Sequence, residues 1–185
     1  KHMNGQVKIV GSKVAFKPKH WQNKYNHNKK HIVPHYGSIG RLDQEFLIKH
    51  SNVKKICEIG TGSGRSTKAL GTHNAEIHTI DQYDHGAKLI PKSAKFYFMH
   101  SQHFWKTYNI SGFNLYFIDA SIKLVDAEEI FKRATDNFKI IFHDYRDEDK
   151  GVRNHRMMLQ YVFDKCHTEE FTGGGCCSLI ECEKL

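Results

Sequence analysis

The sequence predicts a doubly wound α/β fold whose sheet is mostly parallel, with one antiparallel strand near the C-terminus. A short, mostly apolar run at 53–59 leads into a glycine-containing loop and then into helix-forming residues. Further short apolar runs alternate with helix-like segments, as in a parallel sheet covered by helices. A glycine turn at 173–175 separates the last two strand-like segments, which is typical of a hairpin.

In chain order, the first element is an amphipathic helix at 38–50, because Ile39, Leu42, Phe46 and Leu47 recur at helical spacing. After the strand at 53–59, further strands are expected at 75–81, 95–99, 113–119 and 138–142, and the hairpin strands at 168–171 and 177–182. The intervening helices are expected at 65–71, 127–134 and 151–165, with a short helical turn at 87–90.

The loop after the first strand is the clearest sign of a ligand site. Its glycines at 60, 62 and 64 let the backbone turn sharply and approach a ligand without a Cβ atom in the way. Arg65 stands where a dinucleotide fingerprint needs glycine or alanine, and the segment lacks the lysine of a phosphate-binding P-loop. The second strand ends in Asp81, 21 positions after Gly60, and a carboxylate there suits the two hydroxyls of a ribose. The loop is therefore expected to bind a nucleoside-type ligand of another kind.

These residues resemble the class I S-adenosylmethionine-dependent methyltransferases, whose first motif matches 58–64 and whose second-strand acid matches Asp81. The resemblance implies S-adenosylmethionine as cofactor and a Rossmann-like, seven-stranded sheet in a domain at 36–185. It also implies the cofactor-binding residues, which are Glu58, Gly60, Thr61, Gly62, Ser63, Gly64, Asp81, Gln82, Ser101, Gln102 and Asp119. A purely structural strand–turn–helix in another α/β protein is the alternative.

Ionisable residues also end the fourth and fifth strands, at Asp119 and at His143 and Asp144. This pattern resembles the small-molecule O-methyltransferases of the macrocin and catechol type, in which strand-end acids hold a divalent ion. The resemblance implies Asp119, His143 and Asp144 as catalytic residues and as ligands of magnesium or manganese. The sequence departs from it at His143-Asp144, where Asp-Asp or Asp-Asn is usual, and at Ile122, where a catalytic lysine or histidine is usual.

The N-terminal segment 1–35 is predicted to be a basic arm or lid, and residues 1–3 have the character of a cloning remnant. Residues 1–50 carry ten Lys or Arg and two acidic residues, which accounts for the whole net charge of +8. Lysines alternate with aromatic residues at 16–36. Such a composition binds nucleic acid or another polyanion, or it forms a lid over the cofactor. The lid is the favoured interpretation.

Composition describes the setting in which the protein is expected to work. A chain of 185 residues with 39% hydrophobic residues predicts one globular domain. No apolar run approaches the length of a membrane span, and no secretory signal is apparent, so no membrane partner is expected. Five cysteines without framework spacing predict reduced thiols in the cytoplasm. The sequence is also compatible with an oligomer.

These features together predict a methyltransferase that modifies the hydroxyl of a small acceptor, with or without a divalent metal. In the metal-free case Asp119 contacts cofactor or substrate, while His143 acts as the base or packs. A methyltransferase for RNA or another polyanion, recruited by the basic segment, is the first alternative. A cofactor-binding subunit without turnover is the second.

Overall fold

The structure is a computed structural model that describes residues 39–83, 89–143, 160–162, 164–172 and 177–185. The basic segment 1–35 and Asp144 lie outside the described residues, so the predictions made for them remain predictions.

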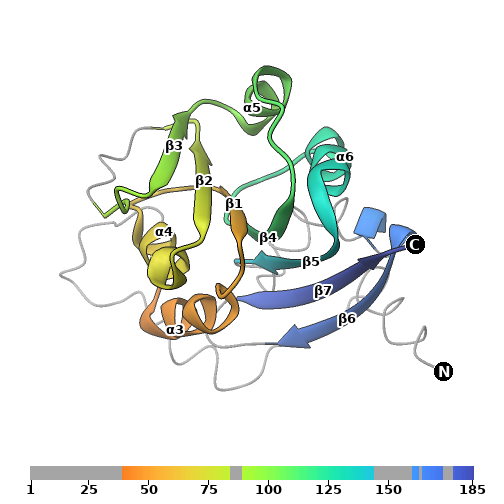
Figure 1. Cartoon of the computed structure of the whole chain (residues 1–185), viewed down its shortest axis with the longest axis horizontal. Helices are drawn as coiled ribbons and strands as arrows, with labels where there is room; N and C mark the ends of the chain where they lie inside the picture. The colour runs from red at the N-terminus through yellow and green to blue at the C-terminus, as the bar shows by residue number, and fades with distance from the viewer. Residues whose placement is uncertain (1–38, 84–88, 144–159, 163, 173–176) are drawn as a thin grey trace, which may run out of the picture.

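A seven-stranded sheet forms the centre of the molecule, in the order β3-β2-β1-β4-β5-β7-β6 (Figure 1). Its strands are β1 (Lys55–Ile59), β2 (Glu76–Asp81), β3 (Ala94–Phe98), β4 (Phe113–Ile118), β5 (Ala134–Phe142), β6 (Cys166–Thr172) and β7 (Ser178–Lys184). The first five strands pair in parallel, whereas β7 is antiparallel both to β5 and to β6. The predicted mostly parallel α/β sheet with an antiparallel C-terminal strand is thereby confirmed.

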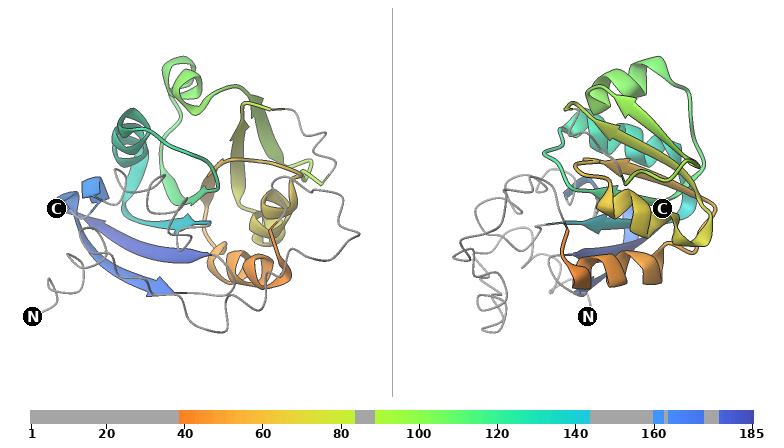
Figure 2. Two further views of the ribbon diagram at one scale, coloured as in Figure 1. Left: turned by 180° about the vertical axis from the view of Figure 1, so that it is seen from behind. Right: turned by 90° about the vertical axis from the view of Figure 1, so that its left-hand side faces the viewer.

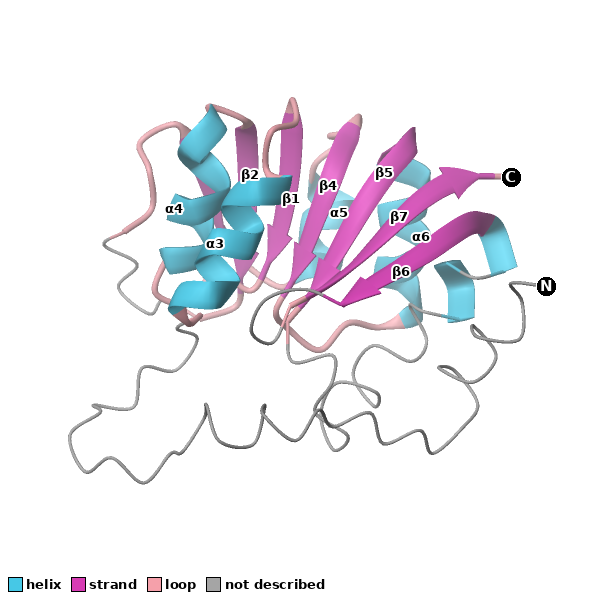
Figure 3. Ribbon diagram, turned by 90° about the horizontal axis from the view of Figure 1, so that it is seen from below, coloured by secondary structure: helices cyan, strands magenta, loops and turns pink. Residues whose placement is uncertain are grey.

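Helices cover both faces of this twisted sheet (Figure 2). The helices are α3 (Arg41–His50), α4 (Arg65–Leu70), α5 (Ser101–Thr107) and α6 (Leu124–Arg133), and a 3₁₀ turn, η1 (Gly71–His73), follows α4. Figure 3 shows α3 and α4 on one face of the sheet and α5 and α6 on the other. Since both faces are covered, adjacent residues of one strand are buried on opposite sides, as Ile56 and Cys57 are in β1.

Two elements differ from the sequence prediction. The helix α5 was not predicted, because its seven residues are too few to show helical periodicity; Phe104 and Trp105 hold it by packing into the core. The strand β5 begins at Ala134, directly after α6, and not at 138. Asn137 pairs with β7 and Ala134 pairs with Phe113 of β4, which supports these extra residues. Such long-range pairing leaves no local signal in the sequence.

The described ranges also bear on the C-terminal helix, the cysteines and the question of a membrane span. Residues 160–162 and 164–165 are helical, within the helix predicted at 151–165. Four cysteines of the described ranges, Cys57, Cys166, Cys177 and Cys182, are buried free thiols. Among the helices of these ranges, none is both long enough and apolar enough to cross a bilayer.

Candidate active site

A cavity of about 380 Å³ lies at the carboxyl ends of β1, β2, β3 and β4. From β1 the chain continues to β2 and β3 on one side of the sheet and then crosses to β4 and β5 on the other. Open α/β sheets bind their ligands at this change of direction, and the volume lies in the range of small-molecule sites. The lining residues are Ile59, Gly60, Gly62, Ile80, Asp81, Gln82, Tyr83, Met99, His100, Ser101, Asp119, Ala120 and Ser121.

The glycine-containing loop forms the floor of the cavity. Gly60 has φ +100°, and a Cβ atom at this position would lie 2.5 Å from the carbonyl oxygen of Asp119. No side chain fits at that distance, so the loop passes directly over the end of β4 only because residue 60 is glycine. The close approach places the backbone of the loop and the side chain of Asp119 on the same cavity.

Asp81 is held in place by two backbone N–H groups. Gly62 N–H donates to its Oδ2 and Tyr83 N–H donates to its Oδ1, each at 2.9 Å. A carboxylate oxygen can accept more than one hydrogen bond. Asp81 lines the cavity, and its fixed carboxylate can receive the two hydroxyls of a ribose.

Glu58, predicted to bind the cofactor, does not line the cavity. Its side chain is buried behind the loop and accepts a hydrogen bond from Thr67 Oγ1 at 2.5 Å. Thr61 is buried as well, and its hydroxyl is hydrogen-bonded to that of Thr79, with the two oxygens 2.6 Å apart. Both residues end up inside because the strand end and the start of α4 close over them, so they support the loop from within.

The remaining predicted cofactor residues divide into two groups. Gly60, Gly62, Asp81, Gln82, Ser101 and Asp119 line the cavity, whereas Ser63, Gly64 and Gln102 do not. Tyr83, Met99, His100, Ala120 and Ser121 line it as well and were not predicted. Each of these five follows the end of β2, β3 or β4, so the strand-end rule that selected Asp81 and Asp119 would have found them.

Burial raises the pKa of Glu58 to about 7, although hydrogen bonds from Ser66, Thr67 and Thr79 favour its charged form. An acid whose pKa is higher in the folded than in the unfolded state contributes stability at low pH and loses it as pH rises. The window runs from the ordinary value of 4.5 to about 7. The free energy of unfolding is therefore expected to fall across this window by up to ~3 kcal/mol.

Urea denaturation of the wild type and of Glu58→Gln between pH 5 and 8 measures this effect. We expect the glutamine variant to lose most of the decline, since an amide does not titrate. Glu128→Gln, on the exposed side of α6, is the matched control and should keep the wild-type slope. Equal slopes in wild type and Glu58→Gln would contradict the prediction.

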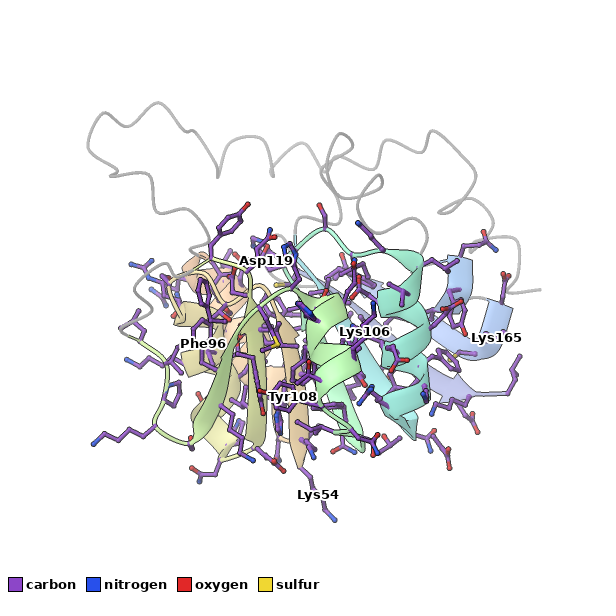
Figure 4. All side chains as sticks on the ribbon, turned by 90° about the horizontal axis from the view of Figure 1, so that it is seen from above. Lys54, Phe96, Lys106, Tyr108, Asp119 and Lys165 are labelled. Carbon is purple, nitrogen blue, oxygen red and sulfur yellow. The ribbon has the colours of Figure 1, made fainter. Side chains whose placement is uncertain are left out.

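Asp119 and His143 meet at the ends of two neighbouring strands. Asp119 N–H donates to the Ile59 carbonyl and His143 N–H to the Ile118 carbonyl, both at 2.9 Å, which continues the ladders of the sheet. These bonds bring the side chains together, with Nδ1 of His143 3.0 Å from Oδ1 of Asp119. Figure 4 shows Asp119 at one end of the strands and Lys54, which precedes β1, at the opposite end.

The two side chains differ in their access to the cavity. Asp119 lines it, whereas His143 is not among the lining residues. The side chain of Asp119 is 18% exposed and that of His143 is 12% exposed. Asp119 is thus the member of the pair that faces the cavity, with His143 behind it.

Two of the three predicted metal ligands, Asp119 and His143, are among the described residues. Within the described ranges no group of three or more His, Cys, Asp or Glu side chains is arranged to hold a metal ion. Ile122 is buried in the core, and Lys123 precedes α6, where its backbone N–H donates to Asp126 at 2.8 Å. The described residues alone therefore do not make up a divalent-metal site.

Comparison with known proteins identifies solved structures of similar fold but no matching family or curated sequence. No known protein family matches the sequence, and no curated protein sequence matches it. An O-methyltransferase from Bacillus cereus, solved with S-adenosylhomocysteine, is similar in structure, with a TM-score of 0.64 and 16% identity over 98% of this chain and 97% of that one. The O-methyltransferase TomG from Streptomyces achromogenes, solved with S-adenosylmethionine, has a TM-score of 0.58 and 15% identity over 80% of this chain and 82% of its own.

A methyltransferase that acts on tRNA has a similar architecture. A tRNA methyltransferase from Aquifex aeolicus has a TM-score of 0.60 and 16% identity over 97% of this chain and 76% of its own. At these identities the similarity concerns the fold, and it agrees with the resemblance seen in residues 58–64 and Asp81. The chain therefore has the fold of the class I S-adenosylmethionine-dependent methyltransferases, and the O-methyltransferases are among its structural neighbours.

Proposed function

We propose that the protein transfers a methyl group from S-adenosylmethionine to a hydroxyl of a small acceptor. The observation that carries this proposal is the Asp119–His143 pair beside a cavity that also holds the carboxylate of Asp81. Asp81 and the loop at Gly60 fit a nucleoside, and a carboxylate with an imidazole behind it can take a proton. Cofactor binding and proton removal are the two tasks of an O-methyltransferase.

S-adenosylmethionine, when bound, supplies a methyl group on a sulfonium centre that an oxygen nucleophile can displace. The residues of this chain bind and align the reactants. The Gly62 N–H and Tyr83 N–H groups keep Asp81 directed at the ribose hydroxyls, and the absent Cβ of Gly60 lets the loop pass over the end of β4 beside the cavity. Such alignment is the largest part of what an enzyme contributes to an in-line displacement.

The Asp119–His143 pair removes the proton that the acceptor hydroxyl loses. A carboxylate oxygen of Asp119 accepts this proton at the cavity, and the Nδ1–H of His143, with Nδ1 3.0 Å from Oδ1, donates a hydrogen bond that orients the carboxylate. The acceptor oxygen gains the methyl group and S-adenosylhomocysteine remains. The pair then releases the proton to water and is ready for the next cycle.

Isothermal titration calorimetry with S-adenosylmethionine, followed by a radiolabelled methyl-transfer assay against catechols and hydroxylated sugars, tests the proposal. We expect binding by the wild type and transfer to at least one acceptor class. Asp119→Asn should lower kcat about 10²- to 10⁴-fold, because the amide cannot accept the proton, while cofactor affinity changes little. Asp136→Asn, on the exposed start of β5, is the control and should retain activity.

Three outcomes of the same assays separate the alternatives. A wild type that does not bind S-adenosylmethionine would refute the proposal. Transfer to tRNA or other RNA, steeply weakened by salt, would favour the polyanion alternative. Activity lost in EDTA and restored by magnesium or manganese would favour a metal that lowers the pKa of the acceptor hydroxyl, held by Asp119, His143 and Asp144.

A further inference from the structure

Exposed large apolar side chains gather at the edge of the sheet that holds the cavity. The described ranges contain six of them, which are Tyr83, Leu89, Phe98, Leu124, Val125 and Leu185. The first lies just after β2, the second lies against the loop after β1, the third ends β3, and the next two begin α6 after β4. Leu185 alone is at the opposite edge, since β7 runs antiparallel to β5. Single apolar residues are common on protein surfaces, whereas a group at one edge is typical of a binding site.

Leu124 and Val125 belong to the Asp119 side of the cavity. The members of the group beside β2 and β3 adjoin Asp81, the residue expected to bind the ribose. Ser121 lines the cavity, and the three residues from there to Leu124 span at most about 11 Å. Because helical side chains tilt toward the N-terminus of their helix, those of the first turn of α6 are directed to the edge where the cavity lies. The pair is thus placed to contact a molecule that reaches Asp119.

Neither the start of α6 nor the core accounts for this apolar pair. Leu124 is 42% exposed and Val125 is 39% exposed, and the buried face of the helix begins only at Asp126. Asp126 also caps the helix by accepting the Lys123 N–H. The first turn of a helix favours acidic residues, and valine is a poor helix former. The helix α3 is capped by an aspartate in the same way, and its first residue is the exposed Arg41. The apolar pair at this place in α6 therefore points to a ligand.

The acidity of the acceptor hydroxyl points to an aromatic ligand as well. A phenol has a pKa of about 10, whereas an aliphatic alcohol is close to water, at about 16. A carboxylate such as that of Asp119 therefore takes the proton of a phenol far more readily than that of a sugar. The ring that carries a phenolic hydroxyl also offers the apolar surface that Leu124 and Val125 can cover.

We propose that Leu124 and Val125 bind the ring of a hydroxylated aromatic acceptor and thereby select it over sugars. The ring lies against the first turn of α6 while its hydroxyl reaches Asp119. There the hydroxyl oxygen loses its proton to the carboxylate and takes the methyl group, as in the proposed reaction. The inference rests on the proposed function for the identity of the site, but binding of the ring can be observed without methyl transfer.

Nuclear magnetic resonance of the full chain, ¹³C-labelled at its leucine and valine methyls, measures this binding in the presence of S-adenosylhomocysteine. The signals of the pair are those that disappear in Leu124→Asn and Val125→Thr, two variants that retain the volume of the side chain. We expect 4-methylcatechol to shift both sets of signals, because an aromatic ring changes the shielding of the methyls that it contacts. Methyl β-D-glucopyranoside should leave them in place. Leu89, which is 40% exposed, is the matched control for Leu124, and its signals should not move.

The same titration gives the dissociation constant of 4-methylcatechol. The double variant Leu124→Asn/Val125→Thr should raise this constant about 5- to 20-fold, since two side chains lose their apolar contact with the ring. Leu89→Asn should leave it at the wild-type value. In the transfer assay the double variant should raise the KM for the catechol and keep most of kcat, as expected when binding of the substrate is weakened.

Unshifted signals of Leu124 and Val125 at millimolar 4-methylcatechol would overturn the proposal, and so would an equal shift at Leu89, which indicates adsorption over the whole surface. Shifts caused by the glucoside or by an RNA oligonucleotide would contradict it by assigning the pair to another ligand. Signals that depend on protein concentration alone would contradict it by assigning the pair to a second copy of the chain.

The two proposals fail in different ways. Methyl transfer to a catechol alongside unshifted signals of the pair would refute the role of Leu124 and Val125 and leave the proposed function intact. Shifted signals without transfer to any acceptor would refute the proposed function and leave the ring-binding site intact.

Discussion

Replacing Asp81 with alanine should weaken S-adenosylmethionine binding by about 30- to 100-fold. The carboxylate is the acceptor expected for the ribose hydroxyls, and hydrogen bonds to a charged group contribute ~1.5–3 kcal/mol. The same carboxylate receives the N–H groups of Gly62 and Tyr83, so its removal also releases the loop from the end of β2. Both effects act in the same direction, and calorimetry with S-adenosylmethionine measures their sum.

Asp136→Ala is the control for this experiment, because it removes the same charge from an exposed position at the opposite end of the sheet. Its affinity for S-adenosylmethionine should equal that of the wild type. Asp81→Asn should fall between the two, since the amide retains one acceptor oxygen. Wild-type affinity in Asp81→Ala would show that the cofactor binds elsewhere.

Replacing Arg133 with alanine should lower the free energy of unfolding by about 3–5 kcal/mol. Its guanidinium is 7% exposed and binds the Glu129 carboxylate at 2.7 Å. It also donates to the carbonyls of Trp105, Tyr108 and Ile110 at 2.8–2.9 Å, which ties the end of α5 and the chain before β4 to α6. Without Arg133 these acceptors stay buried with a lost partner, and that loss dominates the expected effect.

Urea denaturation measures the change, and Arg41→Ala is the matched control. Arg41 forms an ion pair with Glu45 at the similar distance of 2.8 Å, but its side chain is 89% exposed. Water and salt screen such a pair, so the unfolding midpoint should not move measurably. Similar midpoints for the two alanine variants would contradict the prediction, and Arg133→Lys should recover only part of the loss because lysine cannot reach all four acceptors.

The sequence was sufficient to place the strands of the sheet and the loop that follows β1. Apolar runs identified β1, β2, β3 and β4 within two residues of their bounds. In β1, β2 and β4 most residues are buried, because helices cover both faces of the sheet. The glycines of the loop and Asp81 could also be identified from the sequence, because each meets a need of its own position. A backbone at φ +100° and a carboxylate at a strand end are features of one residue and its neighbours.

Other features depend on contacts between distant residues. Glu58 lies one residue before the end of β1 and Asp81 ends β2, yet Glu58 is buried behind the loop and Asp81 lines the cavity. The packing of α4 over the end of β1 is what buries the carboxylate of Glu58 and keeps it from the cavity. The helix α5 likewise has little support in its own sequence and is held by Phe104, Trp105 and Arg133.

By itself the sequence determined the doubly wound α/β fold, the ligand loop and the acid at the end of β2, since each follows from hydrophobic periodicity or from the needs of a single residue. Only the tertiary structure brought Asp43, Asp119 and His143 into one row. The contact between α3 and the ends of β4 and β5 joins residues far apart in the chain, and no pattern within a segment records it. The proposed removal of the acceptor's proton rests on the juxtaposition of Asp119 and His143.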